Sequence, residues 1–131
     1  MSEMMHSTIK NTVADTLIEK LKMEQISWKN SLYERIVSGN VHDLSTIEDH
    51  TGSGFGQWYY MGNGREQYSH LSSFAALETP HTKLHKSGVE AAAAVRRGAV
   101  REAANHLTTM EQASLEVANL LDRLNAESKG Q

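Results

Sequence analysis

The chain has 131 residues, a length that favours a single domain, and we treat residues 1–131 as one unit. Its formal net charge of −3 is too small to predict binding to nucleic acid or to an anionic membrane surface. It contains no cysteine, which excludes disulfides and thiolate metal ligands. No apolar run is long enough to insert into a membrane, and the N-terminus lacks a signal-peptide pattern. We therefore expect a soluble, cytoplasmic protein.

The first predicted element is a long helix that ends near Gly39. Apolar residues recur along it at helical spacing, from Ile9 through Trp28 to Ile36. Gln25 interrupts this stripe where the pattern calls for a core residue. A buried amide costs free energy unless it is hydrogen-bonded. Gln25 therefore either has a specific polar partner or lies near solvent, and the sequence leaves both open.

The middle of the chain is expected to form short elements. We expect a short helix or turn over 43–49, a glycine-rich turn over 51–64, and another short helix within 65–77. Glycines let the backbone turn tightly, and aromatic side chains give the turn a surface to bury. The aromatic residues of this turn are Phe55, Trp58, Tyr59 and Tyr60.

The second long helix is expected to begin after Thr79, which is a favourable N-cap residue. Pro80 suits the first turn of a helix, because its missing N–H would have no partner there. The helix should run to about Arg97, and Gly98 should end it.

The last long helix has the cleanest periodicity. Apolar positions alternate at spacings of three and four from Val100 to Leu124, a heptad seam in which Ser114 is the only polar member. The polar tail over 127–131 is expected to be frayed. These elements predict an all-α fold, a four-helix-type bundle with additional short helices and the glycine-rich aromatic turn.

His81 and His85 are the first candidate site residues. A spacing of four puts both imidazoles on one helix face, which is a recurring way to offer two nitrogens to one metal ion. Gly88 and Ala92 continue this face, and their small size indicates burial against a neighbouring helix. The spacing alone does not establish a site, since ordinary packing is the commoner use of such a pair.

His50 and Ser53 flank the glycine-rich turn, and either can approach the face that carries the two histidines. With Asp49 they supply the residue types of a hydrolase triad, but local clustering does not produce that geometry. The turn also lacks the Lys-Ser/Thr pair of a phosphate-binding loop. We therefore predict that the protein is not an enzyme. The other histidines are expected at the surface or in a loose N-terminus, and they are His6, His42, His70 and His106.

Three motifs in this order resemble the chemoreceptor zinc-binding (CZB) domain. They are residues 28–33 (WKNSLY), 53–60 (SGFGQWYY) and 80–85 (PHTKLH). The resemblance is strongest over 21–124, and its motif residues include Trp28, Gly56, Trp58 and Pro80. It implies a small helical bundle that acts as a sensory or regulatory domain, as in bacterial chemoreceptors and diguanylate cyclases. In diguanylate cyclases the domain is associated with dimers.

The family's zinc site uses three histidines and one cysteine. The resemblance implies that His81 and His85 are retained ligands, whereas Gln25 and Ser53 stand at the positions of the other two. A neutral amide and a hydroxyl are poor zinc ligands, and loss of the thiolate removes negative charge and redox chemistry. We therefore expect no tightly bound cofactor, with zinc only at a weakened site. Gln25 can instead hydrogen-bond to a histidine, and His50 is a possible substitute ligand.

The function expected from these residues is that of a non-catalytic bacterial sensory or regulatory domain of CZB type with a degenerate zinc site. It would act through dimerisation or by binding a signalling protein, in chemotaxis or in cyclic-di-GMP signalling. The alternative is a metal-binding sensor that uses His81, His85 and a substitute ligand such as His50. Whether the chain is a whole protein or a fragment stays open, although Met1 favours a standalone protein.

Overall fold

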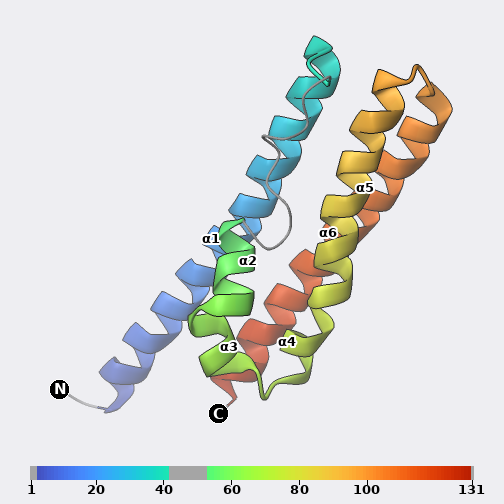
Figure 1. Ribbon diagram of the computed structural model, residues 1–131. Coiled ribbons are helices and arrows are strands. Elements are labelled where there is room, and N and C mark those ends of the chain that lie inside the picture. The colour runs from blue at the N-terminus through green and yellow to red at the C-terminus, as the bar shows by residue number, and fades with distance from the viewer. Residues whose placement is uncertain (1–2, 42–52, 131) are drawn as a thin grey trace.

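The computed structural model describes residues 3–41 and 53–130, and every regular element in these ranges is helical. Three long helices run beside one another, and Figure 1 shows short helices packed between α1 and the α5–α6 pair over half of the length. The all-α bundle predicted from the sequence is confirmed. The elements are α1 (Glu3–Ser38), α2 (Gly54–Gly56), η1 (Gln57–Met61), α3 (Asn63–Tyr68), α4 (Ser72–Ala76), α5 (Glu78–Arg96) and α6 (Val100–Lys129).

Two glycines end long helices, as the sequence predicts. Gly39 follows the last residue of α1 and Gly98 lies between α5 and α6, with φ angles of +80° and +77°. This left-handed conformation is costly for residues that carry a Cβ. At Gly98 it lets the chain reverse, so α5 and α6 pack as an antiparallel pair (Figure 1).

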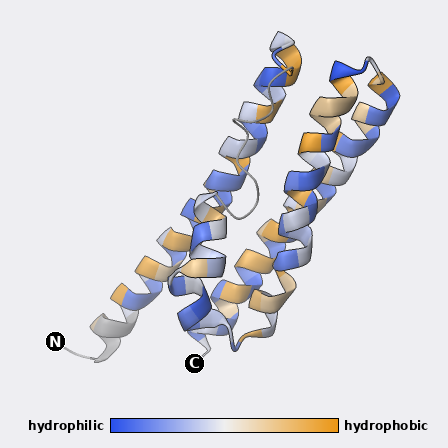
Figure 2. Ribbon diagram, viewed as in Figure 1, coloured by the Kyte–Doolittle hydropathy of each residue, from blue (hydrophilic) through white to orange (hydrophobic). Residues whose placement is uncertain are grey.

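Apolar side chains form two core clusters along the bundle. The first joins α1, the short helices and the C-terminal half of α6, and it is centred on Phe55, Phe74 and Leu121. The second joins α1, α5 and the N-terminal half of α6 through Leu32, Leu84 and Met110. Figure 2 shows apolar and polar residues interspersed along the long helices.

The N-terminal part of α1 does not contribute to the core. Ile9 and Val13 are exposed, although the periodicity places them on the apolar stripe. The buried stripe begins at Ile18, because Asp15 already pairs with Lys129 at the end of α6 and the earlier residues of α1 extend beyond that helix. Val100, predicted to begin the seam of α6, is also exposed because it is the first residue of that helix. These three core assignments are wrong.

Several predicted boundaries are also wrong. The glycine-rich segment is helical from Gly54 onward, and the short helix expected within 65–77 is divided into α3 and α4. Thr79 is not an N-cap, because α5 begins at Glu78 directly after α4 and Leu77. Pro80 lies in the first turn as expected. His6, expected in a loose terminus, lies within α1, whereas the predicted 43–49 element falls outside the described residues.

The C-terminal tail is helical to Lys129 rather than frayed from residue 127. The Glu127 carboxylate accepts hydrogen bonds from Ser72 Oγ (3.2 Å) and from the backbone N–H of Ser73 (3.4 Å). Lys129 pairs with Asp15 of α1. These contacts with α4 and α1 hold the last turn of α6, which a polar sequence by itself does not predict.

A polar cluster joins α1 to α6. Lys29 Nζ lies 2.7 Å from Glu111 Oε1, and the Tyr33 hydroxyl donates to Glu111 Oε2 over 2.6 Å. Partial burial and the nearby Glu111 carboxylate raise the pKa of Tyr33 to about 12. Burial also pushes the pKa of Glu111 upward, but the hydrogen bonds from Lys29 and Tyr33 outweigh it and leave that pKa below its ordinary value.

We expect Glu111→Gln to lower the free energy of unfolding by about 1 kcal/mol near neutral pH, because charge-assisted hydrogen bonds are lost from a partly exposed group. A depressed carboxyl pKa stabilises the fold above the unfolded value of 4.5, and this contribution is lost as the pH falls through the folded pKa. Urea unfolding of both proteins should therefore show a difference that disappears in acid. An equal difference near neutral pH and in acid would contradict the conclusion that the ionised Glu111 carboxylate stabilises the fold.

Candidate functional site

His81 and His85 lie side by side on the buried face of α5. They are 0% and 3% exposed, and their ring centroids are 4.8 Å apart. Gly88 and Ala92, predicted to continue this face, are buried as well. The site lies between the two apolar clusters, since Leu21 and Leu32 of α1 belong to different clusters on either side of it.

An aromatic ring covers each histidine. The Phe55 ring lies 4.1 Å from that of His81 and the Trp28 ring 4.1 Å from that of His85, both centroid to centroid. Phe55 comes from α2 and Trp28 from α1, so the two lids belong to elements far apart in the sequence. Together they separate the imidazoles from solvent.

Gly88 allows the close approach of α1 to α5 at this site. A Cβ built on Gly88 would lie 2.7 Å from Cη2 of Trp28 and 2.8 Å from Cδ2 of Leu32. Real Cβ atoms do not approach other atoms this closely, so the Trp28 ring occupies space that only glycine leaves free. The position of the Trp28 ring over His85 therefore depends on Gly88, which lies one turn after His85 along α5.

Ser53 is buried and caps α2. Its hydroxyl oxygen accepts a hydrogen bond of 3.0 Å from the backbone N–H of Gly56, and its carbonyl accepts one of 2.9 Å from Gln57. The motif residue Gly56 is buried beside it. The Ser53 hydroxyl therefore serves as a structural cap, two residues before the lid Phe55.

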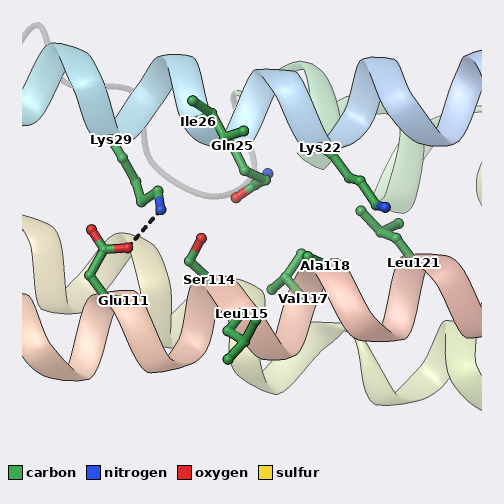
Figure 3. A pocket seen from close by; sticks show the side chains of 10 residues that line it. All are labelled: Lys22, Gln25, Ile26, Lys29, Glu111, Ser114, Leu115, Val117, Ala118 and Leu121. Carbon is green, nitrogen blue, oxygen red and sulfur yellow. Dashed lines mark hydrogen bonds and ion pairs between the residues drawn. The ribbon is translucent and has the colours of Figure 1, made fainter.

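Gln25 is 4% exposed, and its Oε1 atom is buried without a hydrogen-bond partner. The possibility that Gln25 lies near solvent is therefore wrong. Its Oε1 accepts no hydrogen bond from either His81 or His85. The predicted hydrogen bond between Gln25 and a histidine is therefore not formed through this atom. Gln25 lines a groove between α1 and α6, where Figure 3 shows its amide reaching from α1 toward α6.

The other motif residues have packing roles. Trp58 packs over Gly64, where a Cβ would lie 2.6 Å from its Cε2 atom, and it contacts Phe55 and Phe74. Pro80 is buried in the first turn of α5. The sequence reasoning did not identify Phe55 as a lid, although its position two residues after Ser53 was a usable signal.

The remaining histidines do not join this pair in the described residues. His70 is exposed, and His106 is partly exposed with Nδ1 3.2 Å from a Glu90 carboxylate oxygen. The candidate substitute ligand His50 lies outside the described residues, as does His42. The ligand role predicted for His50 and the surface position predicted for His42 therefore stay predictions.

The side chains at positions 25, 53, 81 and 85 are a poor match for zinc. They comprise two imidazoles, a neutral amide and a hydroxyl that already accepts a backbone hydrogen bond. Zinc prefers imidazole and thiolate, and a thiolate also supplies negative charge. Over residues 3–41 and 53–130, no group of three or more His, Cys, Asp or Glu residues is placed to hold a metal ion. The described residues therefore do not fit a four-ligand zinc site.

Comparison with known families matches residues 25–92 to the chemoreceptor zinc-binding domain. The matched range extends from Gln25 to Ala92 and includes Ser53, His81 and His85. No curated protein and no solved structure matches the chain. Within the described residues, no helix has the length and apolar character needed to cross a membrane.

We expect Gly88→Ala to destabilise the protein by about 1–2 kcal/mol, because overpacking against Trp28 and Leu32 outweighs the higher helix propensity of alanine. Urea unfolding measures the loss, and tryptophan fluorescence reports displacement of the ring from His85. Gly130→Ala is the matched control, because a Cβ there meets its nearest atom at 3.5 Å. A Gly88→Ala protein more stable than the parent would contradict the close packing.

Proposed function

The chain belongs to the chemoreceptor zinc-binding domain family, since the match covers just over half of its 131 residues, and we propose that it is a non-catalytic regulatory domain with a degenerate zinc site. It acts in bacterial signal transduction, either chemotaxis or cyclic-di-GMP signalling, through dimerisation or by binding a signalling protein. The observation that supports this proposal is the chemistry and local environment of the Gln25 and Ser53 side chains. One offers a neutral buried amide, and the other uses its hydroxyl to cap a helix.

A regulatory role suits the burial of the histidine pair. His81 and His85 are covered by Phe55 and Trp28, so a substrate in solvent has no direct path to either imidazole. Catalytic groups usually line a concave pocket that admits the substrate. The enclosed pair is better suited to changing the packing of α1, α2 and α5 than to turnover.

The bundle has the means to fold without a bound metal. The two apolar clusters lie on either side of the site and join the three long helices. Small domains that require zinc to fold lack such a core. Loss of two ligands would therefore weaken zinc binding and leave the helical scaffold available for contacts with a partner.

The second candidate is a metal sensor that uses His81, His85 and a substitute ligand such as His50. The observation in its favour is the retained pair, with ring centroids 4.8 Å apart on one helix face. A site with three imidazoles and an open position can bind zinc, copper or nickel. Metal content separates this candidate from the degenerate site.

We expect the purified protein without a histidine tag, incubated with excess zinc and desalted, to retain well below one zinc per chain. The double variant Gln25→His/Ser53→Cys should retain about one, because it restores an imidazole and a thiolate at the family's positions. Its apparent zinc affinity should rise by more than the roughly 10- to 100-fold effect of altering residues that only orient a ligand. His81→Ala in the double variant is the control, and it should remove the gain.

Two outcomes would oppose the proposal. Equal zinc content in the parent and the double variant, both low, would mean that Gln25 and Ser53 are not the former ligand positions. Stoichiometric zinc in the parent would show that the site is not degenerate. His50→Ala would then test the substitute ligand, with loss of zinc favouring the sensor.

A further inference from the structure

Two polar residues that interrupt the apolar stripes of the long helices line the same groove. Gln25 interrupts the stripe of α1, and Ser114 is the only polar member of the predicted seam of α6. Both line a groove of about 280 Å³ between these helices (Figure 3). A polar residue on a buried stripe costs free energy, and sequences break such local rules mainly at functional sites. The coincidence of two such residues in one groove therefore indicates a function for the groove.

The Gln25 amide is directed into this groove. Gln25 is 4% exposed, and its Oε1 atom is buried without a hydrogen-bond partner. Figure 3 shows the amide reaching from α1 toward α6, and the Ser114 hydroxyl reaching from α6 toward α1. A buried acceptor without a partner has already lost its contact with water. A ligand that donates a hydrogen bond to Oε1 would therefore gain more than it would from an exposed acceptor.

Apolar side chains form most of the remaining wall. Ile26 of α1 and Leu115 of α6 are 50% and 64% exposed, whereas Val117 and Leu121 are buried. The groove is thus open to solvent beside Ile26 and Leu115 and apolar at depth, so a ligand can enter without unfolding of the bundle. Mainly apolar walls with a few placed polar groups are the usual composition of a small-molecule site.

Two ion pairs between α1 and α6 flank the polar residues of the groove. Lys29 lies 2.7 Å from Glu111, and Lys22 pairs with Asp122. Lys22 and Lys29 line the groove, so each cation that a ligand would meet there already has an anionic partner within the chain. A charged ligand would have to compete with these pairs, whereas a neutral ligand would not. The charges of the groove therefore favour a neutral ligand.

We propose that the groove between α1 and α6 binds a small neutral amphipathic molecule of about two fused rings, which donates an N–H or O–H hydrogen bond to Gln25 Oε1. The size follows from the volume, since a dry apolar cavity of about 150 Å³ accommodates benzene. The groove, at about 280 Å³, accommodates a larger body of the same kind. The Ser114 hydroxyl, which can donate or accept, would bind a second polar atom of the ligand.

Such a ligand would bridge α1 and α6 close to the cover of the histidine pair. Trp28, whose ring lies over His85, follows Gln25 by about one turn of α1. A molecule held between Gln25 and Ser114 would stabilise the contact of this part of α1 with α6, so the melting temperature should rise with ligand concentration. The use of this binding as a stimulus rests on the proposed function of a regulatory domain, whereas the binding itself does not.

Indole and benzothiophene are the probes that test the hydrogen bond, because they share a two-ring shape and only indole carries an N–H. Isothermal titration calorimetry of the purified protein should show indole binding about threefold more tightly or better, because only indole can donate to Gln25 Oε1. Nuclear Overhauser effects between indole and the methyl groups of Ile26 and Leu115 should place it in the groove. Equal affinities, tighter binding of benzothiophene, or no saturable binding of indole would overturn the proposal.

Gln25→Leu tests the acceptor. Leucine continues the apolar stripe and removes a buried polar atom, so the variant should fold and be at least as stable as the parent. It should keep its affinity for benzothiophene and lose the preference for indole. An unchanged preference for indole would show that Gln25 is not the acceptor and would overturn the proposal.

Ala118→Leu tests the location. Ala118 lines the groove, and the larger side chain should weaken binding of both probes at least about tenfold, because it fills the volume that they need. Ala104→Leu is the matched control on the same helix, since Ala104 is exposed and does not line the groove. Circular dichroism melting confirms that each variant is folded. Equal weakening by the two substitutions, or by neither, would mean that the probes bind elsewhere.

Failure of this inference and failure of the proposed degenerate site are distinguishable. Low zinc content without a preference for indole removes the groove ligand and leaves the degenerate site. Stoichiometric zinc in a parent protein that binds indole through Gln25 keeps the groove ligand and removes the degenerate site.

Discussion

The close approach of α1 to α5 at Gly88 is the constraint on which the rest of the site depends. The Trp28 ring and the Leu32 side chain fill the space that a side chain at position 88 would occupy. This contact brings Trp28 over His85. Gln25, one turn before Trp28, is buried where α1 faces α6.

The same constraint explains why the two substitutions matter chemically. His81 and His85 are enclosed by packing from Trp28 of α1 and Phe55 of α2. The side chains of Gln25 and Ser53 offer an amide and a hydroxyl, and neither carries charge at neutral pH. A divalent ion in an enclosed site needs charge compensation, because transfer from water is costly. Uncharged side chains at Gln25 and Ser53 would not supply the negative charge that a thiolate ligand gives to a zinc site.

Much of the fold could be predicted from the sequence, because apolar periodicity and terminal glycines indicate long helices. Gly39 and Gly98 end helices as expected, and His81, His85, Gly88 and Ala92 share one buried face. The errors arise where tertiary contacts, and not the local sequence, determine where a helix begins, where it ends or which of its residues are buried. The start of α5 follows from its continuity with α4, and the helical C-terminus follows from contacts made by Glu127. Spacing along α1 also cannot reveal that its first turns extend beyond the end of α6, which leaves Ile9 exposed.

Gln25 shows why part of the site could be found only with the structure. The sequence marks it as a polar residue on an apolar stripe, and both burial and exposure were consistent with that pattern. Its Oε1 is buried, and a buried acceptor that stays without a hydrogen bond costs about 1–3 kcal/mol. A leucine at this position would continue the stripe without that penalty. The amide is therefore poorly explained by packing alone, and it lines the groove between α1 and α6.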